Sequence, residues 1–221
     1  MTIPKSSTSI PMLTEIVLPG LVELERLIIH KRPVPTPGKG QALVEMLATG
    51  VSFAEQQMRR GRYAGVPKFP YVLGYDLVCV VVAVGPQVDE SLVGVRVAAV
   101  VKTGAWTTHA LVDAGHLVPV PDSLDAAAAE TVVVNGITAW QMLKKAKVHS
   151  GQTILIHGAN GGVGNTLVQL ARHLSCQSTW FSRSSRSTGC TSTSTSPSCS
   201  TAAGSRRSSS ATAGISTRRR C

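Results

Sequence analysis

Residues 153–164 of the chain read TILIHGANGGVG. Residues 153–157 predict a short buried strand, and the apolar spacing that follows residue 162 predicts a helix. Between them, residues 159–164 fit the A/G-x-G-x-x-G pattern, in which Gly161 lets the backbone approach a pyrophosphate and Gly164 lets the helix pack closely on the strand. The first N–H groups of a helix also favour an anion. We therefore predict a dinucleotide-binding turn with contacts from Ala159, Asn160, Gly161, Gly162, Val163 and Gly164; an ordinary glycine-rich turn is the alternative.

The choice between NADH and NADPH depends on a residue about 20 positions farther on, at the end of a second strand. That position falls near Trp180 to Arg186, in the stretch CQSTWFSRSSR. We expect no regular strand there. Arg183 or Arg186 could meet a 2′-phosphate, but the cofactor stays open between NADPH and NADH.

Upstream of this unit, residues 1–120 carry short apolar runs separated by glycine and proline, as in a β-barrel or sandwich. One helix interrupts them at Phe53 to Arg60, where Ser52 and Glu55 form a capping box. Residues 121–177 differ: an alanine-rich helix follows Asp122 and Ser123, and NGITAWQMLKKAKV continues with helical spacing. The predicted fold class is therefore α+β followed by the start of an α/β unit.

Residues 178–221 have a different composition. They contain 15 serines, 8 threonines and 7 arginines, but no Asp, Glu or Lys. Such a segment buries too little apolar surface to offset its ordering entropy, so we expect disorder. The seven arginines also supply most of the formal net charge of +10. The rest of the chain is only mildly basic, which argues against a dedicated nucleic-acid-binding protein.

The five cysteines include no CxxC pair and offer no structural zinc site. His109 and His116 lack the spacing of metal ligands, so we expect no metal. No apolar run is long enough for a membrane span and no signal peptide is visible, so we expect a cytoplasmic protein without a membrane partner.

Several segments together resemble one known family. They are TGVSFAEQQMRRGRY, FPYVLGYDLVCVVVAVG, VGVRVAAVVKTGAW, LVPVPDSLD, NGITAWQML and SGQTILIHGANGGVGNTLVQLAR, in that order. From about Leu18 to Leu174 the chain resembles the zinc-free quinone oxidoreductase branch of the medium-chain dehydrogenase/reductase superfamily. The resemblance implies a GroES-like catalytic domain over 1–120, part of a Rossmann domain over 121–177, and a foreign tail over 178–221.

The resemblance also implies hydride transfer from NADPH or NADH to a small quinone or enone, and a homodimer in the intact family. From their positions in the matching motifs, the resemblance implies that Tyr63 and Ser52 are catalytic hydroxyl donors. It also implies that Thr138 and Asn135 lie beside the nicotinamide. Each has a plainer alternative: Tyr63 packs its ring, Ser52 only caps a helix, and Thr138 is ordinary helix surface.

Zinc-dependent members of this superfamily carry Cys where this chain has Ser52, and a His-Glu pair where it has Tyr75 and Asp76. Hydroxyl groups are poor zinc ligands beside Cys and His. The resemblance therefore implies catalysis without zinc, by the cofactor and by the placement of the substrate.

The chain departs from the family near Ser175, where the change in composition suggests a truncated or frame-shifted product. Three hypotheses follow: an impaired oxidoreductase, a non-enzymatic remnant, and, ranked last, a nucleic-acid binder that uses the basic tail. We expect weak dinucleotide binding and no quinone turnover. We also expect the apolar side chains Ile154, Ile156, Val168 and Leu174 to lie uncovered.

Overall fold

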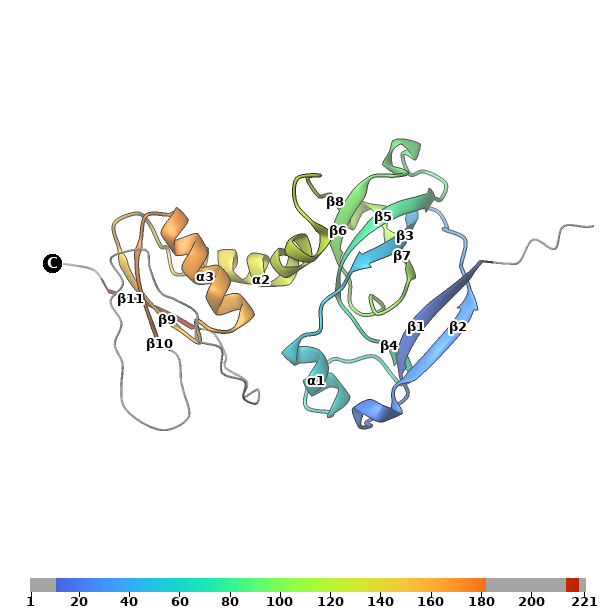
Figure 1. The fold of residues 1–221 in the computed structure, drawn as a ribbon, viewed down its shortest axis with the longest axis horizontal. Helices are drawn as coiled ribbons and strands as arrows, with labels where there is room; N and C mark the ends of the chain where they lie inside the picture. The colour runs from blue at the N-terminus through green and yellow to red at the C-terminus, as the bar shows by residue number, and fades with distance from the viewer. Residues whose placement is uncertain (1–10, 182–213, 219–221) are drawn as a thin grey trace, which may run out of the picture. The chain divides into compact units, whose positions relative to one another are not determined.

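The structure is a computed structural model that describes residues 11–181 and 214–218. The chain divides into two compact units, Met1–Val133 and Val134–Cys221, and the division falls within helix α2 (Ala126–Lys145) (Figure 1). The oxygen Oδ1 of Asp125 caps this helix by accepting the backbone N–H groups of Ala127 and Ala128 at 3.0 and 2.9 Å. The two helical stretches expected on either side of residue 134 are therefore one continuous helix.

The first unit is a β-domain, as predicted. A five-stranded antiparallel sheet has the order β7-β3-β5-β6-β8, and a second sheet has the order β2-β1-β4. The strands are β1 (Met12–Leu18), β2 (Ile28–Pro33), β3 (Gln41–Ala48), β4 (Tyr71–Val72), β5 (Asp76–Val84), β6 (Arg96–Val100), β7 (His109–Asp113) and β8 (Val118–Pro119). Short 3-10 helices connect them at Leu24–Arg26, Glu90–Leu92 and Ala114–His116.

The core of this unit lies along β5, the central strand of the larger sheet. Leu77, Cys79 and Val81 alternate along β5 and are completely buried, as are Val44 from β3 and Val97 from β6. Alternation of this kind places one face of an antiparallel strand in the core. The stretch DLVCVVVAV therefore forms the strand on which the core of the larger sheet is built.

Helix α1 (Phe53–Arg59) is the one α-helix between the strands of the first unit in the described part of the chain. Its capping box is confirmed: the Glu55 backbone N–H donates to Ser52 Oγ at 3.3 Å, and the Ser52 N–H donates to Glu55 Oε2 at 2.7 Å. These two bonds fix where the helix begins. They also hold the Ser52 side chain at the helix N-terminus.

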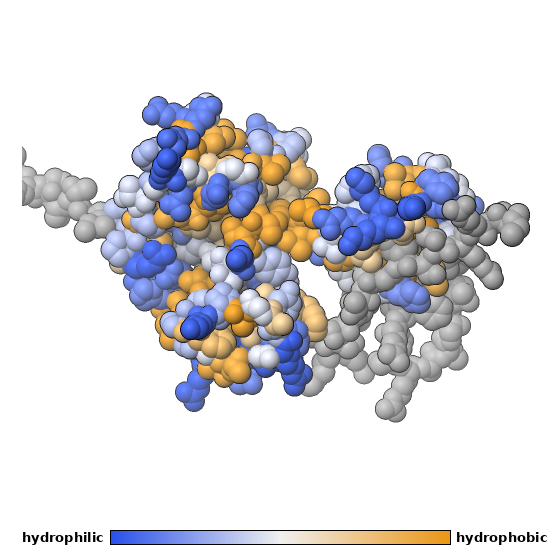
Figure 2. Space-filling model, turned by 180° about the vertical axis from the view of Figure 1, so that it is seen from behind, coloured by the Kyte–Doolittle hydropathy of each residue, from blue (hydrophilic) through white to orange (hydrophobic). Residues whose placement is uncertain are grey.

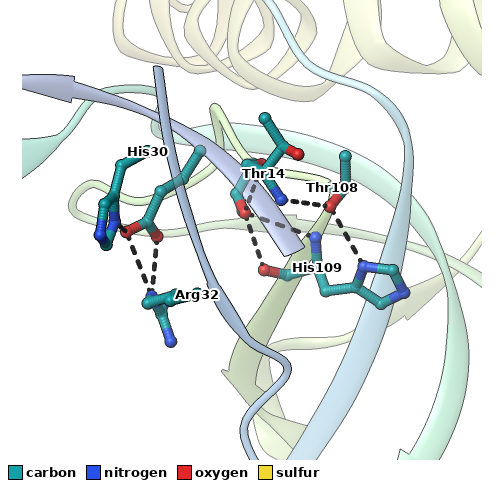
Figure 3. A network of polar contacts seen from close by, with 7 residues as sticks. Thr14, His30, Arg32, Thr108 and His109 are labelled. Atoms are coloured by element: carbon teal, nitrogen blue, oxygen red, sulfur yellow. Dashed lines mark hydrogen bonds and ion pairs between the residues drawn. The ribbon is translucent and has the colours of Figure 1, made fainter. Parts of the chain in front are cut away.

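A polar network ties β1 to β2 and to the segment that leads into β7 (Figure 3). Glu15 Oε1 lies 2.9 Å from His30 Nδ1, and both carboxylate oxygens lie 3.1 Å from Arg32 Nε. On the other side of β1, the Thr14 N–H donates to Thr108 Oγ1 at 3.0 Å, and the Thr108 N–H donates to the Thr14 carbonyl at 2.9 Å. Glu15 is only 6% exposed, so its partners compensate a buried charge.

Replacing Glu15 with glutamine should lower the free energy of unfolding by about 1–3 kcal/mol, because the variant loses charge-assisted bonds to His30 and Arg32. Urea denaturation followed by circular dichroism measures the change. Glu25, an exposed acid for which the described residues provide no ion pair, is the matched control, and Glu25→Gln should change stability by less than about 0.5 kcal/mol. Equal effects of the two substitutions would contradict the prediction.

The second unit is built around β9 (Thr153–His157). Strand β10 (Gln177–Phe181) pairs with β9 in parallel, and β11 (Gly214–Arg218) pairs with its other edge antiparallel. Helix α3 (Gly162–His173) connects β9 to β10 and lies against this sheet (Figure 1). The strand, glycine turn and helix predicted from residues 153–174 are confirmed.

Two expectations for this unit are wrong. Residues 177–181 form a strand, because Thr, Trp and Phe favour strands and β9 offers a free edge. Residues 214–218 form another, so these parts of the expected disordered tail are ordered. Of the four side chains expected to be uncovered, Ile154 and Ile156 are fully buried, and Val168 and Leu174 are partly buried against the same cluster. Residues 182–213 and 219–221 of the expected tail lie outside the described residues.

Candidate functional site

The two predicted catalytic residues lie near each other in the first unit, around Tyr75. Ser52, at the N-terminus of α1, lies near the Tyr75 side chain. Tyr63 also lies near Tyr75, and the residue is 46% exposed. Burial raises the pKa of Tyr75, and the charges of Asp76 and Glu55 act in the same direction. Tyr75 therefore keeps its proton at neutral pH and can donate a hydrogen bond.

Exposed apolar side chains flank these hydroxyl groups in the sequence. Val51 and Phe53, on either side of Ser52, are 72% and 58% exposed. Figure 2 shows that apolar residues reach the surface of the first unit between charged ones. Exposed apolar side chains beside a few polar groups are typical of sites that bind small molecules.

Three carboxyl groups gather beside the hydroxyl groups. Glu55 comes from α1 and is 1% exposed, Asp76 begins β5 and is 7% exposed, and Glu130 comes from α2. Burial raises the pKa of all three, and the charge of Asp76 helps to raise the pKa of Glu130 to about 7. Asp76 and Glu130 lie within hydrogen-bonding reach, so one proton can be shared between them.

Gly50 provides the space for this pair. A Cβ atom at Gly50 would lie 2.5 Å from Glu130 Oε1 and 3.2 Å from Asp76 Oδ1. The Asp76 carbonyl in turn accepts a hydrogen bond from Thr49 Oγ1 at 2.9 Å. The glycine therefore allows the backbone of residues 49–50 to pass directly beside two acidic side chains.

The carboxyl cluster should make the protein less stable as the pH rises. A carboxyl group whose pKa is raised on folding binds more protons in the folded state, so stability falls as the pH increases between the two pKa values. For Glu130 this window runs from 4.5 to about 7. Glu130→Gln should flatten the profile and stabilise the protein above pH 7 by about 1–2 kcal/mol, a figure reduced for solvent screening.

Urea denaturation at pH 5 and pH 8 measures this difference for the unsubstituted chain and for Glu130→Gln. Glu90→Gln, at an exposed acid outside the cluster, is the matched control and should leave the pH profile unchanged. If Glu130→Gln lowered stability at pH 8, the raised pKa would be wrong.

The glycine turn has the geometry that a pyrophosphate site needs. Gly161 is the N-cap of α3, and its N–H donates to the Gly158 carbonyl at 3.0 Å. The first intrahelical bond runs from the Asn165 N–H to the Gly161 carbonyl, at 2.8 Å. The N–H groups of residues 162–164 come before this first bonded residue, so they have no acceptor within the helix and point out of its N-terminus. A Cβ at Gly164 would lie 2.1 Å from the Gly158 oxygen, so only glycine allows this packing.

Asn135 lies directly against the turn. A Cβ at Gly162 would lie 2.8 Å from Asn135 Nδ2 and 3.0 Å from its Oδ1. The structure thus brings together an amide side chain and a turn that are about 27 residues apart in the sequence. Thr138, one helical turn after Asn135, shares its side of α2 and is partly exposed. Around the turn, Ala159 and Gly164 are buried, while Asn160 and Gly162 are exposed and Gly161 and Val163 are intermediate.

Sequence reasoning did not identify Glu130, Gly50 or Tyr75 as parts of a site. The sequence does not indicate that Glu130 belongs to a site, because an acidic residue within an alanine-rich helix is ordinarily exposed to solvent. Tyr75 is notable in the sequence only as a residue in place of a zinc ligand. Arg183 and Arg186, suggested for a 2′-phosphate, lie outside the described residues.

Within residues 11–181 and 214–218, no group of three His, Cys, Asp or Glu side chains is arranged to hold a metal ion. The same residues include no helix that is both long and apolar enough to span a bilayer.

Comparison with known proteins agrees with this architecture. Residues 38–122 match the alcohol dehydrogenase GroES-like domain. The synaptic vesicle membrane protein VAT-1 homolog of Homo sapiens is 32% identical over 160 residues, which are 71% of this chain and 41% of that protein. The quinone oxidoreductase of Thermus thermophilus, also solved with NADPH, is 30% identical with a TM-score of 0.66, over 75% of this chain and 52% of that one.

A human VAT-1 homolog-like protein has a TM-score of 0.72 at 27% identity, over 76% of this chain and 55% of that structure. The chain spans about two fifths of the length of the VAT-1 homologs that it matches. The matches include quinone oxidoreductases, and these solved structures match 75% of this chain, which is more than the GroES-like domain alone. The chain belongs to the medium-chain dehydrogenase/reductase superfamily, among the relatives of the quinone oxidoreductases.

Proposed function

We propose that the chain derives from an NAD(P)H-dependent reductase of quinones or activated alkenes, and that this activity is impaired in it, so that it binds the cofactor weakly and turns over no quinone. The glycine turn is the observation that carries the proposal. Its N–H groups at the start of α3, its close packing at Gly164 and its contact with Asn135 fit a pyrophosphate. The quinone oxidoreductase from Thermus thermophilus, to which the chain is similar, was solved in complex with NADPH.

The site residues of this chain suit such a reaction. When bound, NAD(P)H supplies the hydride. Residues 159–164 would hold its pyrophosphate, with Asn135 and Thr138 beside the nicotinamide. Ser52 and Tyr63, both near Tyr75, would donate hydrogen bonds to the substrate carbonyl oxygen, on which negative charge develops. Val51 and Phe53 would contact the apolar body of the substrate.

A non-enzymatic remnant is the competing proposal, and the antiparallel pairing of β11 with β9 favours it. A nucleic-acid binder using the basic tail is the third. It predicts salt-sensitive RNA binding that disappears when residues 178–221 are deleted.

Two binding experiments test the reductase proposal without requiring turnover. Titration with 1,4-benzoquinone, read from tyrosine resonances in NMR spectra, should saturate and weaken in a Ser52→Ala/Tyr63→Phe double variant. Titration with ADP-ribose should shift the N–H resonances of residues 161–164. If neither ligand bound at these residues, the reductase proposal would fail in favour of the remnant.

We further predict that the purified chain carries well under one zinc ion per molecule. Ser52 and Tyr75 offer hydroxyl groups where zinc-dependent relatives would need thiolate and imidazole, and hydroxyl groups are weak zinc ligands. Elemental analysis after gel filtration measures the ratio. One zinc ion per chain would contradict the prediction.

A further inference from the structure

A cavity of about 530 Å³ opens at the C-terminal end of α1 and is lined by three arginines. Its lining consists of Leu21, Val22, Glu23, Arg59, Arg60 and Arg62. We propose that this arginine cavity binds a phosphate group. The proposal is independent of the proposed reductase activity.

The backbone that carries these arginines is held in place. The Arg60 N–H donates to the Gln56 carbonyl at 3.3 Å, and the Arg62 N–H donates to the Gln57 carbonyl at 2.8 Å. Gly61 between them has a φ of 67°, and a Cβ there would lie 2.9 Å from Leu21 Cδ1. A glycine in this conformation lets the turn after α1 close against residue 21. The two arginines are therefore presented from a fixed turn, which lowers the entropic cost of binding.

Arg59 is the buried member of the group. Its side chain is 3% exposed, and Nη1 donates to the Val22 carbonyl at 2.6 Å and to Glu23 Oε2 at 3.1 Å. Its Nε is buried and has no hydrogen-bond partner among the described residues. A buried guanidinium with an unused donor is costly unless an acceptor completes it. An anion in the adjoining cavity would supply the missing hydrogen-bond acceptor.

The charges lining the cavity do not balance. Glu23 is the one acid against three guanidinium groups, and its side chain is 82% exposed. Neither Arg60 nor Arg62 has an ion pair within the described part of the chain. An excess of two positive charges matches a phosphate dianion, and guanidinium groups pair with phosphate oxygens in a bidentate geometry. A monocarboxylate would compensate only one of these charges.

Titration of the full chain with inorganic phosphate tests the proposal, at constant ionic strength and with arginine Nε–H resonances as the readout. The resonances of Arg59, Arg60 and Arg62 should shift and saturate together. An Arg60→Gln/Arg62→Gln double variant should bind at least about tenfold more weakly, because two charge-assisted contacts are lost. Lys39→Gln removes an exposed cation of the same unit outside the cavity and should leave binding unchanged.

Glu23→Gln gives the opposite expectation. Removing the one acid of the lining should strengthen phosphate binding, since it removes repulsion and releases Arg59 from its ion pair with Glu23. Co-sedimentation with phosphatidic acid vesicles, compared between the unsubstituted chain and the double variant, separates a lipid headgroup from a free phosphate as the source. Shifts that fail to saturate, that survive in the double variant, or that weaken in Glu23→Gln would overturn the proposal.

Discussion

Replacing Gly164 with valine should unfold the second unit and leave the first unit folded. A Cβ at this position would lie 2.1 Å from the Gly158 oxygen and 2.7 Å from the Ala159 Cα atom. Both neighbours are backbone atoms, so no rotamer change can relieve the contact. The residue is also buried, in the first turn of α3. We expect the free energy of unfolding of this unit to fall by about 3 kcal/mol or more, which approaches the whole stability that a small core supplies.

Hydrogen exchange measures this effect separately in each unit. Protection of the β9 and α3 amides should disappear in Gly164→Val, while protection of β3, β5 and β6 should persist. Gly161→Ala is the matched control, because its Cβ would lie 3.5 Å from the Gly158 oxygen and its φ of −87° suits any residue. It should fold normally. Equal protection of β9 in the two variants would show that the close approach at Gly164 is not needed for folding.

The local features of the fold could be predicted because neighbouring residues determine them. The capping box at Ser52 depends on a residue three positions away, and the turn at residues 158–164 depends on its own glycines. The carboxyl cluster could not be predicted in the same way. Glu55, Asp76 and Glu130 come from three elements, and only the tertiary fold of the first unit brings Glu130 to Asp76.

The last strands were missed for a different reason. The composition of residues 178–221 as a whole predicts disorder, and it conceals the short strand formers in STWF and GIST. Pairing with β9 supplies hydrogen bonds that composition does not report. These residues have only a weak local preference for a strand, and pairing with the free edges of β9 stabilises the strand conformation.

The chain should bind NADPH only weakly, with a dissociation constant above about 1 mM, and should show no NADPH-dependent quinone reduction. In a complete dinucleotide-binding fold, the strand before the glycine turn has a parallel neighbour on each side, in the order 3-2-1-4-5-6. Here β9 takes the place of strand 1 and β10 that of strand 2. The position of strand 4, which begins the nicotinamide-binding half, is taken by β11 in the antiparallel direction.

While β11 pairs with β9, no parallel strand can occupy that edge, so the described sheet holds only the adenosine half of a cofactor site. NADPH and 2′-phospho-ADP-ribose should therefore bind equally well, within about threefold, because the nicotinamide gains no contacts. Isothermal titration of both ligands, beside a quinone-dependent NADPH oxidation assay, measures this. Gly161→Val should weaken both ligands alike by crowding the pyrophosphate, as expected if each binds at the turn. Micromolar NADPH binding with steady turnover would show that this arrangement of strands completes an active site, and the proposed impairment would be wrong.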